Sequence, residues 1–174
     1  MRIATRGHHR NRELAIGVLL AGFVALLLPA CSLKRTAVNV LGDALSGGGG
    51  VYVSDDDPEL IREAIPFGLK TYESLLALSP EHQGLLLAAS SGFTAYAYLI
   101  QNDADRLDAT DLSQARDLRA RAHKLYLRGR DYALRGLDVA HAGFKARLSS
   151  KRDAALATMT KDDVPFLYLS LIHI

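Results

Sequence analysis

The chain has 174 residues, of which 49% are hydrophobic and 23% charged, with a formal net charge of +2. Four basic residues and one acidic residue lie in the first 30 positions, so the remaining 144 residues carry 17 Lys and Arg against 18 Asp and Glu. A formal charge of −1 gives no basis for nucleic-acid binding. This remainder fits one domain, and its many Ala, Leu and Arg residues, with few β-branched runs, predict an all-α fold.

Residues 1–30 have the pattern of a secretory signal peptide. Four arginines precede an apolar run over residues 14–28, and the small residue Ala30 follows. This is the order of a basic region, a hydrophobic region and a cleavage site. The run is shorter than the about 20 residues that span a bilayer. The residues Leu28-Pro29-Ala30-Cys31 resemble a bacterial lipobox, which implies cleavage between Ala30 and Cys31 and a covalent lipid on the Cys31 thiol.

Cys31 is the only cysteine in the sequence and the predicted lipidation site. A buried structural cysteine is the alternative, but an unpaired thiol is a liability in an oxidising compartment unless it is modified. Stable attachment takes about two acyl chains or more, so a triacylated Cys31 would anchor the protein without a spanning helix. The residue directly after Cys31 is Ser32. An Asp at this position would resemble a signal for retention in the inner membrane. We therefore expect the periplasmic side of the outer membrane.

Residues 31–50 are expected to form a tether. Val38, Leu41 and Leu45 have helical spacing and predict one short amphipathic helix. The four glycines 47–50 predict flexibility. A phosphate-binding loop would need a following Lys-Ser/Thr pair, which is absent from the sequence.

The first long helix is expected to start after three consecutive aspartates and to end near Leu78. Asp57 fits the N-cap and Pro58 the first helical position, whereas a calcium loop would space its carboxylates at alternating positions. Pro66 is expected to kink this helix. Five apolar residues predict its buried face: Ile61, Ile65, Leu69, Tyr72 and Leu76.

A second helix is predicted over residues 81–101, with Ser79 as its cap. It is apolar nearly all round and has small residues at 88–92, so it should be buried between other helices. Ser90 and Ser91 lack the surroundings of a nucleophile elbow, which favours a packing role. Residues 102–108 are expected to form a polar break.

A third helix is predicted over residues 111–139, capped by Asp111 or Thr110. Its arginines fill the faces opposite the apolar stripe. They could bind an anionic substrate or lipid headgroup, but a solvated face with partners such as Asp117 and Asp131 is favoured.

The C-terminal part is predicted to contain a turn at residues 141–144, two short helices, and a last helix opened by a capping box from Thr160 to Asp163. The sequence offers no cluster for metal binding, because its later histidines lack ligand spacing and no further Cys is present. No metal or other cofactor is expected apart from the lipid on Cys31. No enzymatic cluster is recognised.

Residues 72–99 are similar to a degenerate tetratricopeptide repeat, through Tyr72, Pro80 and Phe93, although Ala89-Ser90 replaces the usual Leu-Gly pair. The chain as a whole resembles the T component of TRAP transporters, the TatT lipoprotein family. The segments that carry this resemblance are VYVSDDDPEL (51–60), LLLAASSGFTAYAY (85–98), AHKLYLRGRDYALRGL (122–137) and LATMTKDDVPFLY (156–168).

The resemblance implies an all-helical domain over residues 51–168, built of stacked helical hairpins like tetratricopeptide repeats. It further implies a non-enzymatic periplasmic lipoprotein that docks a solute-binding protein and can form a homotrimer with a channel for small hydrophobic ligands. No ligand-binding residue carries over from the family. The alternative is a helical-repeat scaffold in outer-membrane or envelope assembly.

Residues 169–174, LSLIHI, can be encoded by CTGTCTCTTATACACATC, which matches the end of a transposase-based sequencing adapter. The family's chains also continue past this point. We therefore expect residues 169–174 to be adapter read-through and the native domain to be truncated at its C-terminus.

Overall fold

The computed structural model describes residues 29–47 and 54–171, with side chains from Arg35 onward. The signal peptide up to Leu28, the glycines at 48–50 and the last three residues lie outside this part. The chain divides into two units, Met1–Val38 and Asn39–Ile174. All regular structure in the described part is helical, which confirms the all-α prediction; the stacking of hairpins as repeats stays a prediction.

The first two described helices differ in how well the sequence predicts them. Helix α2 covers Pro29–Gly47 and is longer than the predicted short helix. Helix α4 covers Pro58–Leu78 and begins as expected, since the Asp57 carboxylate accepts hydrogen bonds from the N–H groups of Glu59 and Leu60. It runs through Pro66 as one continuous element.

Helix α5 covers Gln83–Leu107, which corrects both predicted ends. Ser79 instead caps the end of α4, because its N–H donates to the Leu75 carbonyl. The α5 N-cap is His82, whose Nδ1 accepts a hydrogen bond from the Leu85 N–H. At the other end Ala104 is buried and polar neighbours form ion pairs, so the expected break at residues 102–108 is helical up to Leu107.

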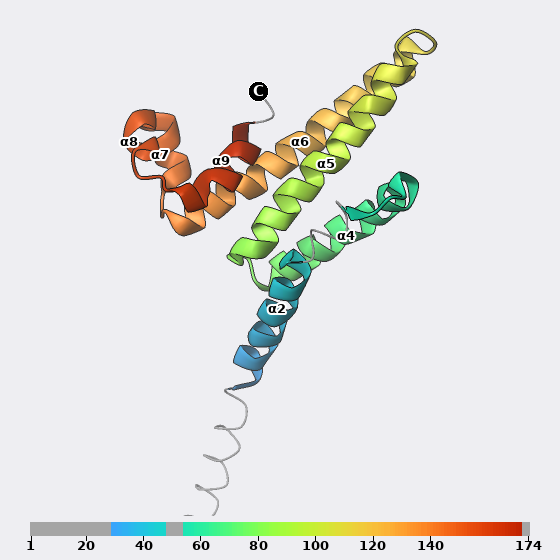
Figure 1. Cartoon of the computed structure of the whole chain (residues 1–174). Coiled ribbons are helices and arrows are strands. Elements are labelled where there is room, and N and C mark those ends of the chain that lie inside the picture. Colours follow the sequence, from blue (N-terminus) through green and yellow to red (C-terminus); the bar gives the residue numbers. More distant parts are fainter. Residues whose placement is uncertain (1–28, 48–53, 172–174) are drawn as a thin grey trace, which may run out of the picture. The chain divides into compact units, whose positions relative to one another are not determined.

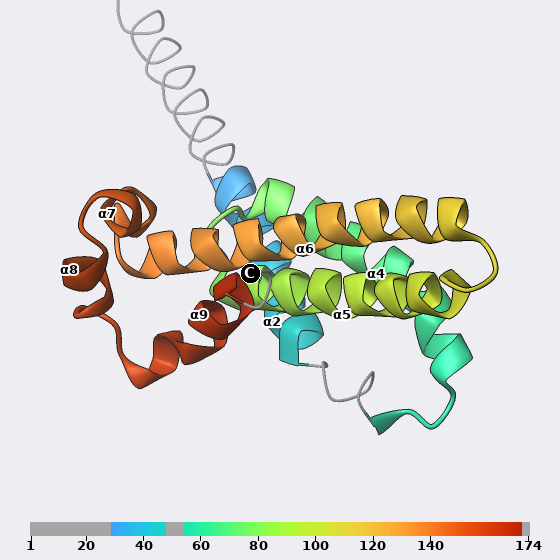
Figure 2. The same ribbon diagram turned by 90° about the horizontal axis from the view of Figure 1, so that it is seen from above.

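Helices α5 and α6 (Leu112–Ala140) lie side by side and form the centre of the second unit (Figures 1 and 2). Asp111 caps α6 as predicted, by accepting from the Gln114 N–H. Small residues allow the close approach: the buried Ser90 hydroxyl donates to the Gly129 carbonyl at 2.8 Å. A Cβ added at Gly129 would lie only 3.0 Å from the Ser90 carbonyl oxygen.

The C-terminal helices pack against the end of α6. They are α7 (Phe144–Ser150), α8 (Arg152–Leu156), the 3₁₀ turn η1 (Lys161–Asp163) and α9 (Val164–Leu171). The predicted turn is present, with Gly143 at a φ of 75° that favours glycine. The aromatic ring of Phe166 occupies the space beside Gly136, where any added Cβ would collide with it.

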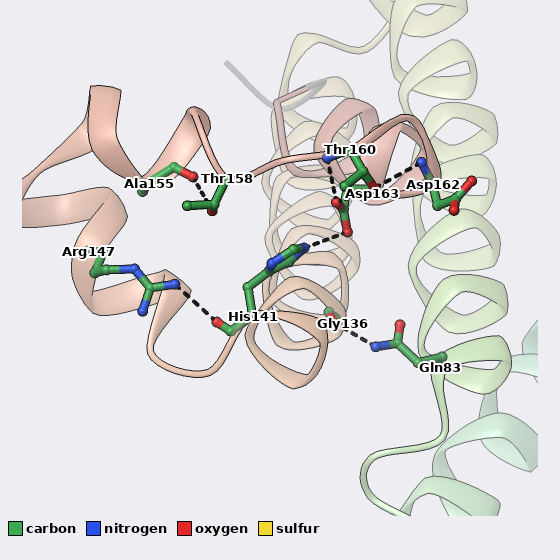
Figure 3. Close-up of polar contacts among 9 residues, drawn as sticks. All are labelled: Gln83, Gly136, His141, Arg147, Ala155, Thr158, Thr160, Asp162 and Asp163. Carbon is green, nitrogen blue, oxygen red and sulfur yellow. Dashed lines mark hydrogen bonds and ion pairs between the residues drawn. The ribbon is translucent and has the colours of Figure 1, made fainter.

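The predicted capping box forms and is tied to α6 (Figure 3). The Asp163 carboxylate, 6% exposed, accepts from the Thr160 N–H and hydroxyl and lies 2.9 Å from His141 Nε2. Burial raises the pKa of Asp163, but the hydrogen bonds from Thr160 and His141 lower it by more than burial raises it, so the net shift is downward. This pair therefore fixes the chain after α8 onto the end of α6.

Among the described residues, three arginines of α6 form ion pairs. Arg119 pairs with Asp105 and Asp108, and Arg128 with Glu73. Arg130 pairs with its neighbour Asp131, as predicted. Within the described part of the chain the other predicted partner, Asp117, forms no ion pair. The solvated-face interpretation therefore holds for these arginines, with partners that sequence spacing did not identify.

Candidate functional site

A cavity of about 660 Å³ lies between α4 and α5, beside the end of α2. Its size falls within the range of roughly 300–1,000 Å³ typical of small-molecule sites. We call it the α4–α5 groove. Helix α4 lines it with Ile61, Ile65, Gly68, Leu69 and Tyr72; α5 with Gly84, Leu87, Ala88, Ser91, Gly92, Ala95, Tyr98 and Leu99; and α2 with Asp43, Ser46 and Gly47.

The groove exists because the two helices present side chains of different size. The α5 wall has mostly small residues, spaced three or four apart on one face, whereas the α4 wall has branched and aromatic ones apart from Gly68. The walls touch where Leu69 meets Gly92: a Cβ added at Gly92 would lie 2.8 Å from Leu69 Cδ2. The α5 wall runs from Gly84 to Leu99, roughly 22 Å at 1.5 Å per residue.

The two ends of the groove differ in charge. At the end formed by α2, Asp43 is the only charged residue among the sixteen that line the groove. Beyond the other end Arg62 of α4 donates to Asp103 of α5 at 2.7 Å. Glu59 and Arg106 are the further members of this ion-pair cluster. The middle of the groove is therefore apolar and its one unmatched charge is a carboxylate.

His82 lies next to Asp43 and contacts both α2 and the start of α5. Its Nδ1 accepts the Leu85 N–H, so that nitrogen carries no proton. Its Nε2 lies 3.1 Å from the Asn39 carbonyl oxygen and 3.3 Å from Asp43 Oδ1. The imidazole is 8% exposed and holds the start of α5 to the end of α2.

A polar cluster on the other side of α4 fixes this helix to α6. The Glu73 carboxylate, 10% exposed, accepts from the Tyr132 hydroxyl at 2.8 Å and from Lys70 at 2.6 Å, and pairs with Arg128. Phe93 stacks on Tyr132 at 5.7 Å, and the Arg128 guanidinium lies 4.8 Å above the Phe93 ring. Glu73 therefore positions α4 and with it one wall of the groove.

Two opposing effects act on the ionisation of Glu73. Burial raises its pKa, but the hydrogen bonds from Lys70, Tyr132 and Arg128 and the charge of Arg128 lower it more. The net shift is downward, so the cluster holds Glu73 in its charged form. Tyr132 shows the converse: burial and the Glu73 carboxylate raise its pKa.

The groove was not among the predicted sites, and the sites that were predicted lie elsewhere. Cys31 and Ala30 are in the first turn of α2, where the proposed cleavage and lipidation stay predictions. Ser90 serves packing, as expected, and its neighbour Ser91 lines the groove. In the part of the chain with described side chains, no three His, Cys, Asp or Glu residues come together as a metal site.

A second cavity, of about 620 Å³, lies near the C-terminal half of α6. Its lining mixes acids and bases, among them Glu81, Asp131, Asp138, Arg135 and Lys145. Arg135 already donates to the Pro80 carbonyl, and Asp138 accepts from the Lys145 N–H at 3.0 Å. The α4–α5 groove is the better candidate because it combines apolar walls with little competing internal pairing.

None of the helices in the described segments combines the length and the apolar character that crossing a bilayer requires.

Comparisons with known proteins bear on the same helices. Residues 54–171 match the family model of the TRAP transporter T-component, TAtT. An uncharacterized protein of Treponema pallidum (strain Nichols) is 34% identical over 162 residues. That match covers 82% of this chain and 50% of the relative, so the chain spans about half the relative's length. The family match includes every helix from α4 to α9, and the chain belongs to the TRAP transporter T-component family.

Proposed function

We propose that this protein is an accessory component of a TRAP-type transporter. It is held at the periplasmic face of a bacterial membrane by a lipid on Cys31 and docks a periplasmic solute-binding protein. The family match over residues 54–171 carries this proposal. The family is one of transporter components and not of enzymes, which agrees with the sequence-based expectation.

The α4–α5 groove gives the proposal a site for the transported compound. Its apolar walls suit a small hydrophobic molecule, because removing apolar surface from water stabilises the bound state by roughly 25 cal/mol per Å². Tyr98, 58% exposed, lies on the rim and leaves the groove accessible from solvent. A molecule released by a docked solute-binding protein could enter along this side.

Docking is tested by co-purification. We expect the tagged protein, produced with the TRAP solute-binding protein of its own genome, to retain that protein through affinity purification from solubilised membranes. The Cys31→Ala variant should stay uncleaved and unlipidated and still retain the partner, because lipidation and docking are separate properties. Recovery of barrel-assembly proteins in place of the solute-binding protein would contradict the transporter role.

Ligand binding is tested with the neutral fluorophore Nile red. We expect saturable binding to the wild type and at least about tenfold weaker binding to Ala88→Trp, since an indole would fill the middle of the groove. Ala120→Trp makes the same change at an exposed position of α6 and should bind as the wild type does. Equal binding to both variants would exclude the groove as the site.

A further inference from the structure

The charges around the α4–α5 groove select among hydrophobic compounds. Among the described residues that line the groove there is no Lys, Arg or His, and the one charged residue is Asp43. Arg62, next to the lining residue Ile61, is 26% exposed and is already paired with Asp103 and Glu59. A carboxylate in the groove would therefore meet no cation among the described lining residues and would be repelled by Asp43.

The surroundings of Asp43 leave its carboxylate available to a ligand. Its side chain is 77% exposed, and its neighbour His82 accepts the Leu85 N–H at Nδ1. The Ser46 hydroxyl is turned to the Asp43 carbonyl at 3.2 Å, so it lies at the same end and can accept a further hydrogen bond.

We propose that the α4–α5 groove binds single-chain amphiphilic amines, with the apolar chain between Leu69 and Leu99 and the ammonium group at Asp43. This inference rests on the proposed function of the groove as a ligand site. It assigns Asp43 as the residue that sets headgroup preference. Because Asp43 is exposed, the preference is moderate: about threefold to tenfold between an amine and a carboxylate of equal chain length.

The test uses displacement of Nile red by decylamine, decanol and decanoate at neutral pH, below their micelle concentrations. These probes share a ten-carbon chain and differ in headgroup charge. We expect decylamine to bind most tightly, decanol next and decanoate most weakly. The Asp43→Asn variant should bind decanol as the wild type does and lose most of the difference between decylamine and decanoate.

A matched control separates the local charge from the net charge of the protein. Asp117→Asn removes the same charge from an exposed site on α6 that has no ion pair among the described residues, and should keep the full preference. Decanoate binding as tightly as decylamine, or a preference that survives in Asp43→Asn, would overturn the headgroup assignment and leave the groove as a ligand site. Nile red binding that Ala88→Trp does not weaken would overturn the groove itself.

Discussion

The two sides of α5 show opposite outcomes of the same sequence feature. Both sides carry small residues: Ser90 and Thr94 toward α6, and Ala88, Gly92 and Ala95 toward α4. On the α6 side the helices come into direct backbone contact. On the α4 side a cavity of about 660 Å³ remains.

The difference lies in the partner helix. Helix α6 also has small residues at this interface, such as the buried Ala122, Gly129 and Ala133. The two backbones therefore come close together, and the Ser90 hydroxyl donates to the Gly129 carbonyl. Helix α4 has mostly larger side chains on this face, such as Ile61, Ile65 and Tyr72, which hold its backbone away from α5. A stripe of small residues therefore gives close packing only where both helices have one.

The largest expected effect comes from introducing a valine at the α5–α6 interface and, in a second variant, at the α4–α5 interface. Gly129→Val should lower the free energy of unfolding by about 3 kcal/mol, because its methyl groups must displace the Ser90 backbone and Thr94. Gly92→Val should change it by less than about 1 kcal/mol, since only the end of the Leu69 side chain has to move. Urea unfolding followed by circular dichroism measures both.

Equal losses of stability in the two variants would show that the α4 side is as closely packed as the α6 side. Gly92→Val should also weaken Nile red binding, because it adds volume to the groove wall. Gly129→Val lies outside the groove, so we expect it to affect Nile red binding only through its effect on folding.

The next effect concerns how α4 is held at its distance from α5. Glu73→Gln should lower the free energy of unfolding at neutral pH by roughly 1–2 kcal/mol, because it removes the charge that Lys70 and Arg128 stabilise. The folded pKa of Glu73 lies below its ordinary 4.5. The stabilisation is therefore complete above pH 4.5 and is lost as the pH falls through the folded pKa.

The measurement is the free energy of unfolding as a function of pH. The wild type should lose stability on acidification more steeply than Glu73→Gln, and the remaining slope in the variant should include the contribution of Asp163, whose pKa is also lowered. Parallel pH curves for the two proteins would show that Glu73 contributes no charged-state stabilisation. In that case the charge of Glu73 does not help to hold α4 against α6.

Local features of the fold were predictable from the sequence. The caps Asp57, Asp111 and Thr160 act on backbone groups two or three residues away, so their spacing is enough to identify them. The end of α4 near Leu78 was predicted correctly, but the cap of α5 was predicted wrongly. Ser79 does not cap α5, because it donates its hydroxyl to Asn39, forty residues away, at 2.6 Å. His82 then caps α5, although histidine is not among the preferred N-cap residues.

The groove depends on the distance between helices, which periodicity does not give. The buried face predicted for α4 contained Ile61, Ile65, Leu69 and Tyr72, and the structure places all four on the groove wall. Their apolar character was read correctly, but the pattern does not distinguish a core from a cavity. The helical stretch up to Leu107 was missed for a similar reason, since Asp103 and Asp105 find arginine partners only in the folded chain.

The smallest effects test the α5–α6 side at two neighbouring hydroxyl groups. Among the described side chains, the buried Thr94 hydroxyl has no hydrogen-bond partner, whereas the Ser90 hydroxyl donates to the Gly129 carbonyl. Thr94→Val should raise the free energy of unfolding by up to about 1 kcal/mol, because it replaces an unsatisfied buried oxygen with a methyl group. Ser90→Ala should lower it by a similar amount. Opposite signs in urea unfolding would show that this side gains from hydrogen bonding as well as from close approach; a loss of stability in Thr94→Val would mean that its hydroxyl is satisfied in solution.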